Sequence, residues 1–77
     1  MVKTGIGAEI RKLRFELGVA IGEDVSQNKL GIIMGEVTGQ TIYNYENNLT
    51  TPPGYFVPYL RSLVTMAQNE KTALQAA

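Results

Sequence analysis

Apolar residues recur at intervals of three or four positions along most of this chain, which is the spacing of one face of an α-helix. Glycine and proline interrupt the pattern and divide it into short segments. No segment shows the alternation of a half-buried β-strand between hairpin turns. We therefore predict an all-α fold, a compact domain of four to five helices. The apolar positions are, segment by segment, Ile6, Ile10, Leu13 and Leu17; Leu30, Ile33 and Met34; Ile42, Tyr45 and Leu49; and Leu60, Leu63, Val64 and Ala67.

Residues with strong positional preferences mark where these helices begin. Thr4, Ser26 and Thr38 are predicted to cap the first three helices, because a side-chain hydroxyl oxygen accepts a hydrogen bond from a free backbone N–H. Proline suits only the first turn of a helix, so Pro58 predicts that the last helix begins near Val57.

Other residues mark where the helices end. Gly18 and Gly35 are predicted to end the first two helices, since glycine readily adopts the left-handed conformation of a helix C-terminus. The segment 18–25 has no helical period and is predicted to be a loop. Asn47 and Asn48, which also tolerate left-handed geometry, are predicted to close the third helix.

The composition excludes several classes of function. With no His and no Cys among 77 residues, the chain has no zinc finger, thiol nucleophile, Ser-His-Asp triad or disulfide. A chain this short forms one domain and buries only about 60% of the surface that it exposes when unfolded. It lacks the roughly 18 consecutive apolar residues of a membrane span and the apolar region of a signal peptide. We expect a cytoplasmic protein that is not an enzyme and binds no cofactor or metal.

Positive and negative charges balance, with seven Lys and Arg against seven Asp and Glu. A formal net charge of zero argues against a strongly basic nucleic-acid binder. Three of the cations, Arg11, Lys12 and Arg14, lie together in the first helical segment. Either they bind a phosphate backbone, or they form a solvated helix face together with Glu9 and Glu16.

The second and third helical segments are joined by about three residues around Gly35, which is typical of a helix-turn-helix corner. Two helices that cross steeply need a turn residue with positive φ, and glycine adopts it most easily. They also need a small residue where they touch, and Gly31 is predicted to lie there. Val37 and Ile42 are predicted to hold the third helix on the second.

The exposed face of the third helix carries amides, hydroxyls and a phenol, with Glu46 as its only charge. A purely solvated face is usually rich in Glu, Lys and Arg. Asn and Gln pair with the major-groove edge of adenine, and Thr methyl groups pack on thymine methyls. We therefore favour DNA recognition over the alternatives of a neutral surface or a protein-contact face. The exposed residues are Thr38, Gly39, Gln40, Thr41, Tyr43, Asn44 and Asn47.

Three stretches, SQNKLGIIMG, VTGQTIYNYEN and TTPP, together resemble the Cro and phage-repressor-like (Xre-type) helix-turn-helix family. The resemblance extends from Ile6 to about Val64, and its most specific part is the segment 40–47. It implies a compact domain in which the helix around 38–47 enters the major groove.

The resemblance also implies roles for individual residues. Gln27 corresponds to a glutamine that binds phosphate and braces the recognition helix, Tyr45 to a core aromatic, and Glu46 to an acid with an internal contact. The implied base contacts are Thr38, Gly39, Gln40, Tyr43 and Asn44. The predicted phosphate contacts are Gln27, Thr41, Asn47, Asn48 and Thr50, together with Arg11 from the first helix.

The sequence differs from the family pattern at three places. The predicted loop 18–25 is longer than the usual link between the first two helices. Glu36 is an extra residue between Gly35 and Val37, where the family runs directly from glycine to an apolar residue. Gly39 stands where Arg, Gln or Lys is frequent, and glycine costs up to about 1 kcal/mol in a helix.

The last third of the chain is expected to complete the core and to form the contact between two copies in a dimer. The domain is predicted to cover 1–66, with 67–77 as a C-terminal tail that is a frayed helix. The predicted dimer surface covers 59–74. Three aromatic residues near the start of the last helix are predicted to pack in the core or at the dimer edge: Tyr55, Phe56 and Tyr59.

These inferences lead to a functional hypothesis. We expect a sequence-specific double-stranded DNA-binding regulator of transcription, a repressor that binds a palindromic operator as a homodimer, with half-sites about one helical turn apart. Two alternatives remain open: a protein-interaction module that keeps the fold without strong DNA binding, and an antitoxin-type autoregulator.

Overall fold

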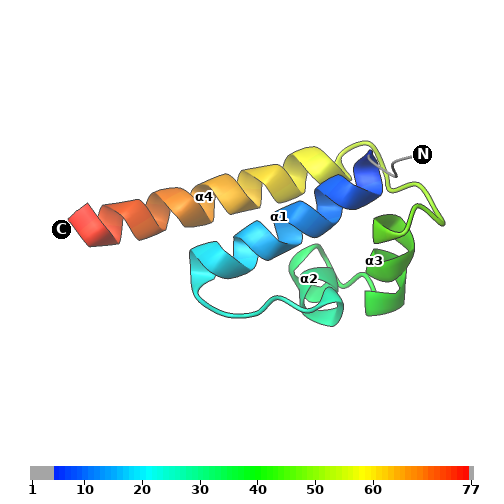
Figure 1. Ribbon diagram of the computed structural model, residues 1–77, viewed down its shortest axis with the longest axis horizontal. Coiled ribbons are helices and arrows are strands. Elements are labelled where there is room, and N and C mark those ends of the chain that lie inside the picture. Colours follow the sequence, from blue (N-terminus) through cyan, green and yellow to red (C-terminus); the bar gives the residue numbers. More distant parts are fainter. Residues whose placement is uncertain (1–4, 77) are drawn as a thin grey trace.

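The computed structural model describes residues 5–76 and, within that range, contains four α-helices and no strand. The helices are α1 (Ile6–Ile21), α2 (Gln27–Ile33), α3 (Gly39–Glu46) and α4 (Phe56–Ala76). The all-α prediction is confirmed. The long helices α1 and α4 run side by side in the same direction, and the short helices α2 and α3 lie together on the other side of α1 (Figure 1).

The first helix is longer than predicted. It continues to Ile21, so the prediction of a loop is wrong for residues 18–21, and the connection to α2 is short. Gly22, with φ 77°, is the left-handed C-cap, and its N–H donates to the Gly18 carbonyl. Gly18 instead allows the chain that follows α1 to pass close to the helix, because a β-carbon at residue 18 would lie 2.9 Å from the carbonyl oxygen of Glu23. Thr4 lies outside the described residues.

The predicted caps of the next two helices are confirmed. The Ser26 hydroxyl accepts a hydrogen bond from the Lys29 N–H at 3.0 Å, at the start of α2. The Thr38 hydroxyl accepts one from the Thr41 N–H at 3.1 Å, at the start of α3. Each bond satisfies a backbone donor that has no partner within its own helix.

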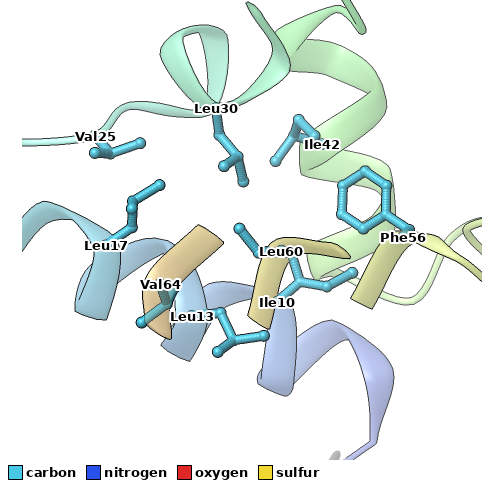
Figure 2. Close-up of a cluster of buried hydrophobic side chains, with 9 residues drawn as sticks. All are labelled: Ile10, Leu13, Leu17, Val25, Leu30, Ile42, Phe56, Leu60 and Val64. Atoms are coloured by element: carbon cyan, nitrogen blue, oxygen red, sulfur yellow. The ribbon is translucent and has the colours of Figure 1, made fainter. Parts of the chain in front are cut away.

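A single hydrophobic core joins all four helices (Figure 2). Leu30 from α2 and Ile42 from α3 meet the apolar face of α1, and α4 closes the core from the opposite side. The rings of Tyr45 and Phe56 meet edge to face with centroids 5.1 Å apart, which ties the end of α3 to the start of α4. The buried apolar side chains are Ile10, Leu13, Leu17, Val25, Leu30, Ile42, Phe56, Leu60 and Val64.

Four residues that were expected inside are exposed. Leu49 is outside because α3 ends at Glu46, and the following turn directs its N–H to the Asn44 carbonyl at 2.8 Å. Tyr55 precedes α4, and Tyr59 lies off the face of α4 that carries Phe56, Leu60 and Val64. Ile6 is at the very start of α1 and is only half covered.

The last helix begins at Phe56, one residue before the predicted start, and continues without a break to Ala76. The predicted boundary between 66 and 67 therefore falls inside α4. Within residues 5–76, no helix is both long and apolar enough to cross a membrane.

Candidate nucleic-acid interface

Helices α2 and α3, with the turn between them, form a corner (the α2–α3 corner) whose backbones approach closely. A β-carbon at Gly31 would overlap the Val37 carbonyl oxygen, which confirms Gly31 as the small residue at the contact. The Val37 N–H in turn donates to the Gly31 carbonyl at 2.8 Å. This position therefore requires glycine.

The extra turn residue is accommodated by backbone conformation. Gly35 has φ 107°, as predicted, and Glu36 follows it with φ 65°. A non-glycine residue in the left-handed region costs about 1–2 kcal/mol. The turn nevertheless closes, because the Val37 bond to Gly31 is made beyond the insertion.

The outward face of α3 is neutral and polar, and its side chains pair with one another. Gln40 Nε2 donates to Asn44 Oδ1 at 3.0 Å, so the two amides, one turn apart, hold each other in place. The hydroxyl oxygens of Thr38 and Thr41 lie 2.9 Å apart at the start of the helix. Tyr43 is 45% exposed beside them.

One predicted base-contact position is shaped by a residue from the neighbouring helix. A β-carbon at Gly39 would overlap Oδ1 of Asn28, which lies in the first turn of α2. Gly39 thus leaves room for the Asn28 side chain, and it adds no side chain of its own to the face. Asn28 itself is exposed.

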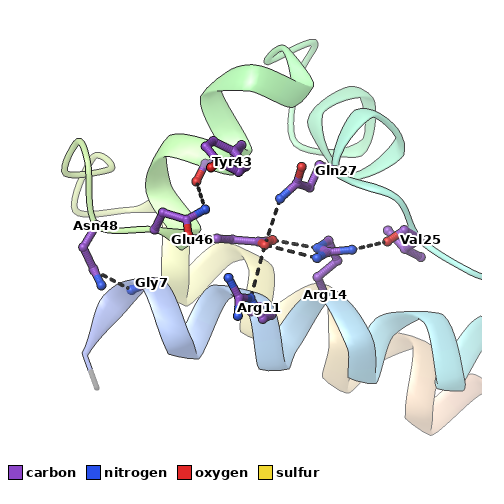
Figure 3. A network of polar contacts seen from close by, with 9 residues as sticks. Gly7, Arg11, Arg14, Val25, Gln27, Tyr43, Glu46 and Asn48 are labelled. Atoms are coloured by element: carbon purple, nitrogen blue, oxygen red, sulfur yellow. Dashed lines mark hydrogen bonds and ion pairs between the residues drawn. The ribbon is translucent and has the colours of Figure 1, made fainter. Parts of the chain in front are cut away.

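A buried carboxylate holds α3 against α1 and α2 (Figure 3). The Glu46 side chain is fully covered and accepts hydrogen bonds from Arg14 Nε at 2.6 Å and Arg14 Nη2 at 3.1 Å. Gln27 Nε2 donates to the same carboxylate at 3.1 Å. Arg11 lies 3.7 Å away with a side chain that is 60% exposed. The prediction that Glu46 makes an internal contact is confirmed.

Arg14 differs from both sequence-based interpretations of the basic cluster. Its side chain is 23% exposed, and Nη1 donates to the Val25 carbonyl at 2.9 Å, so it neither forms a solvated face nor is free for phosphate. The guanidinium instead joins α1, the start of α2 and the end of α3. Arg11 remains accessible from the same side.

Two of the residues after α3 that are predicted to contact phosphate, Asn48 and Asn47, also make contacts within the protein. Asn48 Oδ1 accepts a hydrogen bond from the Gly7 N–H at 3.1 Å, and so satisfies a free donor of α1 from outside that helix. Asn47 Nδ2 donates to the Tyr43 carbonyl at 2.9 Å and closes α3. Thr50 is exposed at the end of this turn.

Sequence reasoning did not find the roles of two residues at this surface. Arg14 was assigned to an exposed basic cluster, although it lies four residues after Ile10 and three before Leu17, on the buried stripe of α1. The role of Asn28 had no sequence signal, because it depends on which residue of α3 lies opposite. Among the described residues, no group of His, Cys, Asp or Glu is placed to hold a metal ion.

No protein-family model, curated protein or solved structure matches this chain. The functional interpretation therefore rests on the α2–α3 corner, on the side chains that α3 exposes, and on the buried contacts that hold α3 in place.

Proposed function

We propose that this protein is a sequence-specific double-stranded DNA-binding regulator of transcription, a repressor of the Cro and phage-repressor-like helix-turn-helix family. In this proposal α3 enters the major groove and α2 crosses the backbone. The observation that carries it is the outward face of α3, where Gln40, Asn44 and Tyr43 are presented by a helix that is anchored through Glu46.

The chemistry of this face suits base recognition. The amides of Gln40 and Asn44 are joined, which leaves Gln40 Oε1 and the Asn44 NH₂ group for an external partner. An acceptor and a donor side by side match the N6 amino group and N7 of adenine. The start of such a helix reaches the base edges first, and there Thr38 and Thr41 present hydroxyl and methyl groups.

Phosphate contacts would surround this face. Arg11 is an exposed cation 3.7 Å from Glu46 at the end of α3, and the hydroxyls of Thr41 and Thr50 add neutral donors. Gln27 already donates to Glu46, so a phosphate would bind to a side chain that is held in place beforehand. Such contacts orient a protein on the duplex without reading its sequence.

Charge pairing makes the zero net charge compatible with DNA binding. Glu46 is neutralised by Arg14, Glu23 pairs with Lys29, and Glu9 with Arg61. Since the net charge is zero, we expect weak non-specific binding and a strong dependence on base contacts.

A second copy of the chain would supply the remaining affinity. One module of this size makes few contacts, whereas a homodimer on a palindromic operator doubles them. The outer side of α4 exposes Tyr59 (48%) and Met66 (65%) within the predicted dimer surface. We propose that this face pairs the two copies, and that the protein acts in the cytoplasm, where operator DNA lies.

The proposal is tested by titrating the protein into mixed-sequence duplex DNA at low salt and then raising the salt concentration. A DNA-binding regulator binds with an affinity that falls steeply as salt increases. Operator selection is then tested with Gln40→Ala combined with Asn44→Ala, which should abolish sequence preference while the thermal unfolding curve stays unchanged. The control replaces a partly exposed residue of α1 outside both the α2–α3 corner and the predicted dimer surface, Glu16→Gln, and should leave preference intact.

A second candidate is a protein-interaction module that uses the same face. It is favoured by one observation, that α3 carries no Lys or Arg. Absence of duplex binding at low salt would exclude the DNA-binding proposal and support this one. An antitoxin-type autoregulator would bind DNA through the same surface and in addition bind a second protein.

A further inference from the structure

The N-terminal end of the α3 face lacks a side chain of its own at residue 39. Asn28, from the first turn of α2, reaches into that space: its Oδ1 lies 1.9 Å from the position that a β-carbon of residue 39 would occupy, and its backbone nitrogen lies 3.1 Å from that position. An amide from a neighbouring helix therefore stands where the third helix has glycine. Any larger residue at position 39 would displace it.

The first turn of α2 contacts both ends of α3. Gln27 is directed to the C-terminal end, where it donates to Glu46. Asn28 lies against the N-terminal end, beside Gly39, which is the first residue of the helix after the Thr38 cap. Because the N-terminal end of a recognition helix is the part that reaches base edges first, Asn28 is the better placed of the two for a base.

We infer that Asn28 is a specificity-determining residue, whose amide contacts a base pair in the major groove in place of a side chain at position 39. This inference rests on the DNA-binding function proposed above. The amide of asparagine pairs with N6 and N7 of adenine, so the ligand is an A·T base pair at the edge of the half-site read by α3. Its exposure leaves the amide accessible.

The experiment measures base preference at every position of the half-site, by selection from randomised duplexes with the wild type and with Asn28→Ala. We expect the wild type to prefer A·T at one position, and Asn28→Ala to lose roughly 5- to 150-fold of the preference there and none elsewhere. Gly39→Ala should lose the same preference, because its methyl group displaces Asn28.

A relocated amide provides the decisive variant. In Asn28→Ala combined with Gly39→Asn, the amide comes from α3 into the space that Asn28 leaves, and the preference at that position should return. Glu16→Gln on α1, outside both the α2–α3 corner and the predicted dimer surface, is the control and should change no preference. Thermal unfolding of each variant shows whether it remains folded.

Two results would overturn the inference while leaving the DNA-binding function intact. In one, Asn28→Ala weakens binding equally for all sequences, which identifies a phosphate contact. In the other, every base preference survives in Asn28→Ala. If the wild type binds no duplex, the proposed function itself fails, and the inference fails with it.

Discussion

The Arg14 guanidinium donates two hydrogen bonds to the Glu46 carboxylate, from Nε at 2.6 Å and from Nη2 at 3.1 Å, although 32 residues separate them in the chain. Charged groups inside a protein are tolerated only when they are paired and hydrogen-bonded. Here the pair fixes the end of α3 relative to α1, and Gln27 adds α2 to the same contact (Figure 3). The orientation of the candidate interface therefore depends on an ion pair behind it.

Arg14→Ala should destabilise the fold strongly, because it leaves the covered Glu46 carboxylate without its closest partner. Breaking a buried pair from one side costs about 3 kcal/mol. Arg11→Ala is the matched control: Arg11 is 3.7 Å from the same carboxylate but 60% exposed, so its loss should cost less than about 1 kcal/mol. Urea unfolding followed by circular dichroism measures the stability of both variants. Equal losses of stability would contradict the role of Arg14 as the main partner of Glu46.

Asn48 should be sensitive to substitution in two separable ways, since it has φ 60° and its Oδ1 accepts from the Gly7 N–H. Asn48→Gly keeps the backbone conformation and loses the bond, at about 1 kcal/mol. Asn48→Ala loses the bond and also strains the backbone, so it should be worse by about 0.5–1 kcal/mol. Thermal unfolding ranks the three proteins. If the alanine variant is as stable as the wild type, neither role holds.

Gly31→Ala should separate α2 from α3, because the new methyl group overlaps the backbone carbonyl of Val37, which cannot rotate away as a side chain would. Overpacking of this kind costs about 1–3 kcal/mol. Gly54→Ala is the control: no heavy atom lies within 4 Å of a β-carbon there, so we expect a change within about 0.5 kcal/mol. Denaturant midpoints compare the two, and a neutral Gly31→Ala would show that the corner relaxes easily.

Glu36→Asn should stabilise the protein. Glu36 has φ 65° in the turn between α2 and α3, and asparagine tolerates this conformation better than glutamate. We expect a gain of about 0.5–1 kcal/mol in the free energy of unfolding. Glu36→Gln removes the charge but keeps the strain, so it should stay within about 0.5 kcal/mol of the wild type. A gain of equal size in both variants would assign the effect to charge.

Local features of the chain were sufficient to predict most of the secondary structure. The Ser26 and Thr38 caps were correct because each bond spans only three residues. The end of α1 was wrong because two glycines, Gly18 and Gly22, compete as C-caps. Gly18 remains helical, since what it accommodates is the carbonyl of Glu23 on the returning chain.

In the candidate site, too, the local features could be predicted and the contacts between distant segments could not. The neutral character of α3 follows from its residues, and Ile42 identifies its inner side by helical spacing. The role of Gly39 could not be predicted, because it depends on Asn28 across the corner. The phosphate contact of Asn48 stays a prediction, and the bond that its Oδ1 accepts from Gly7 could not be predicted, because Gly7 lies 41 residues earlier in the chain.

The all-α class, the α2 and α3 caps and the glycine in the turn could be predicted from the amino-acid sequence, because helical spacing and capping involve residues within one or two turns of each other. The inward direction of Arg14 and the position of Asn28 beside Gly39 arise from tertiary packing. Those outcomes depend on which helix faces come together. Burial of the shared core of α1, α2, α3 and α4 selects that arrangement.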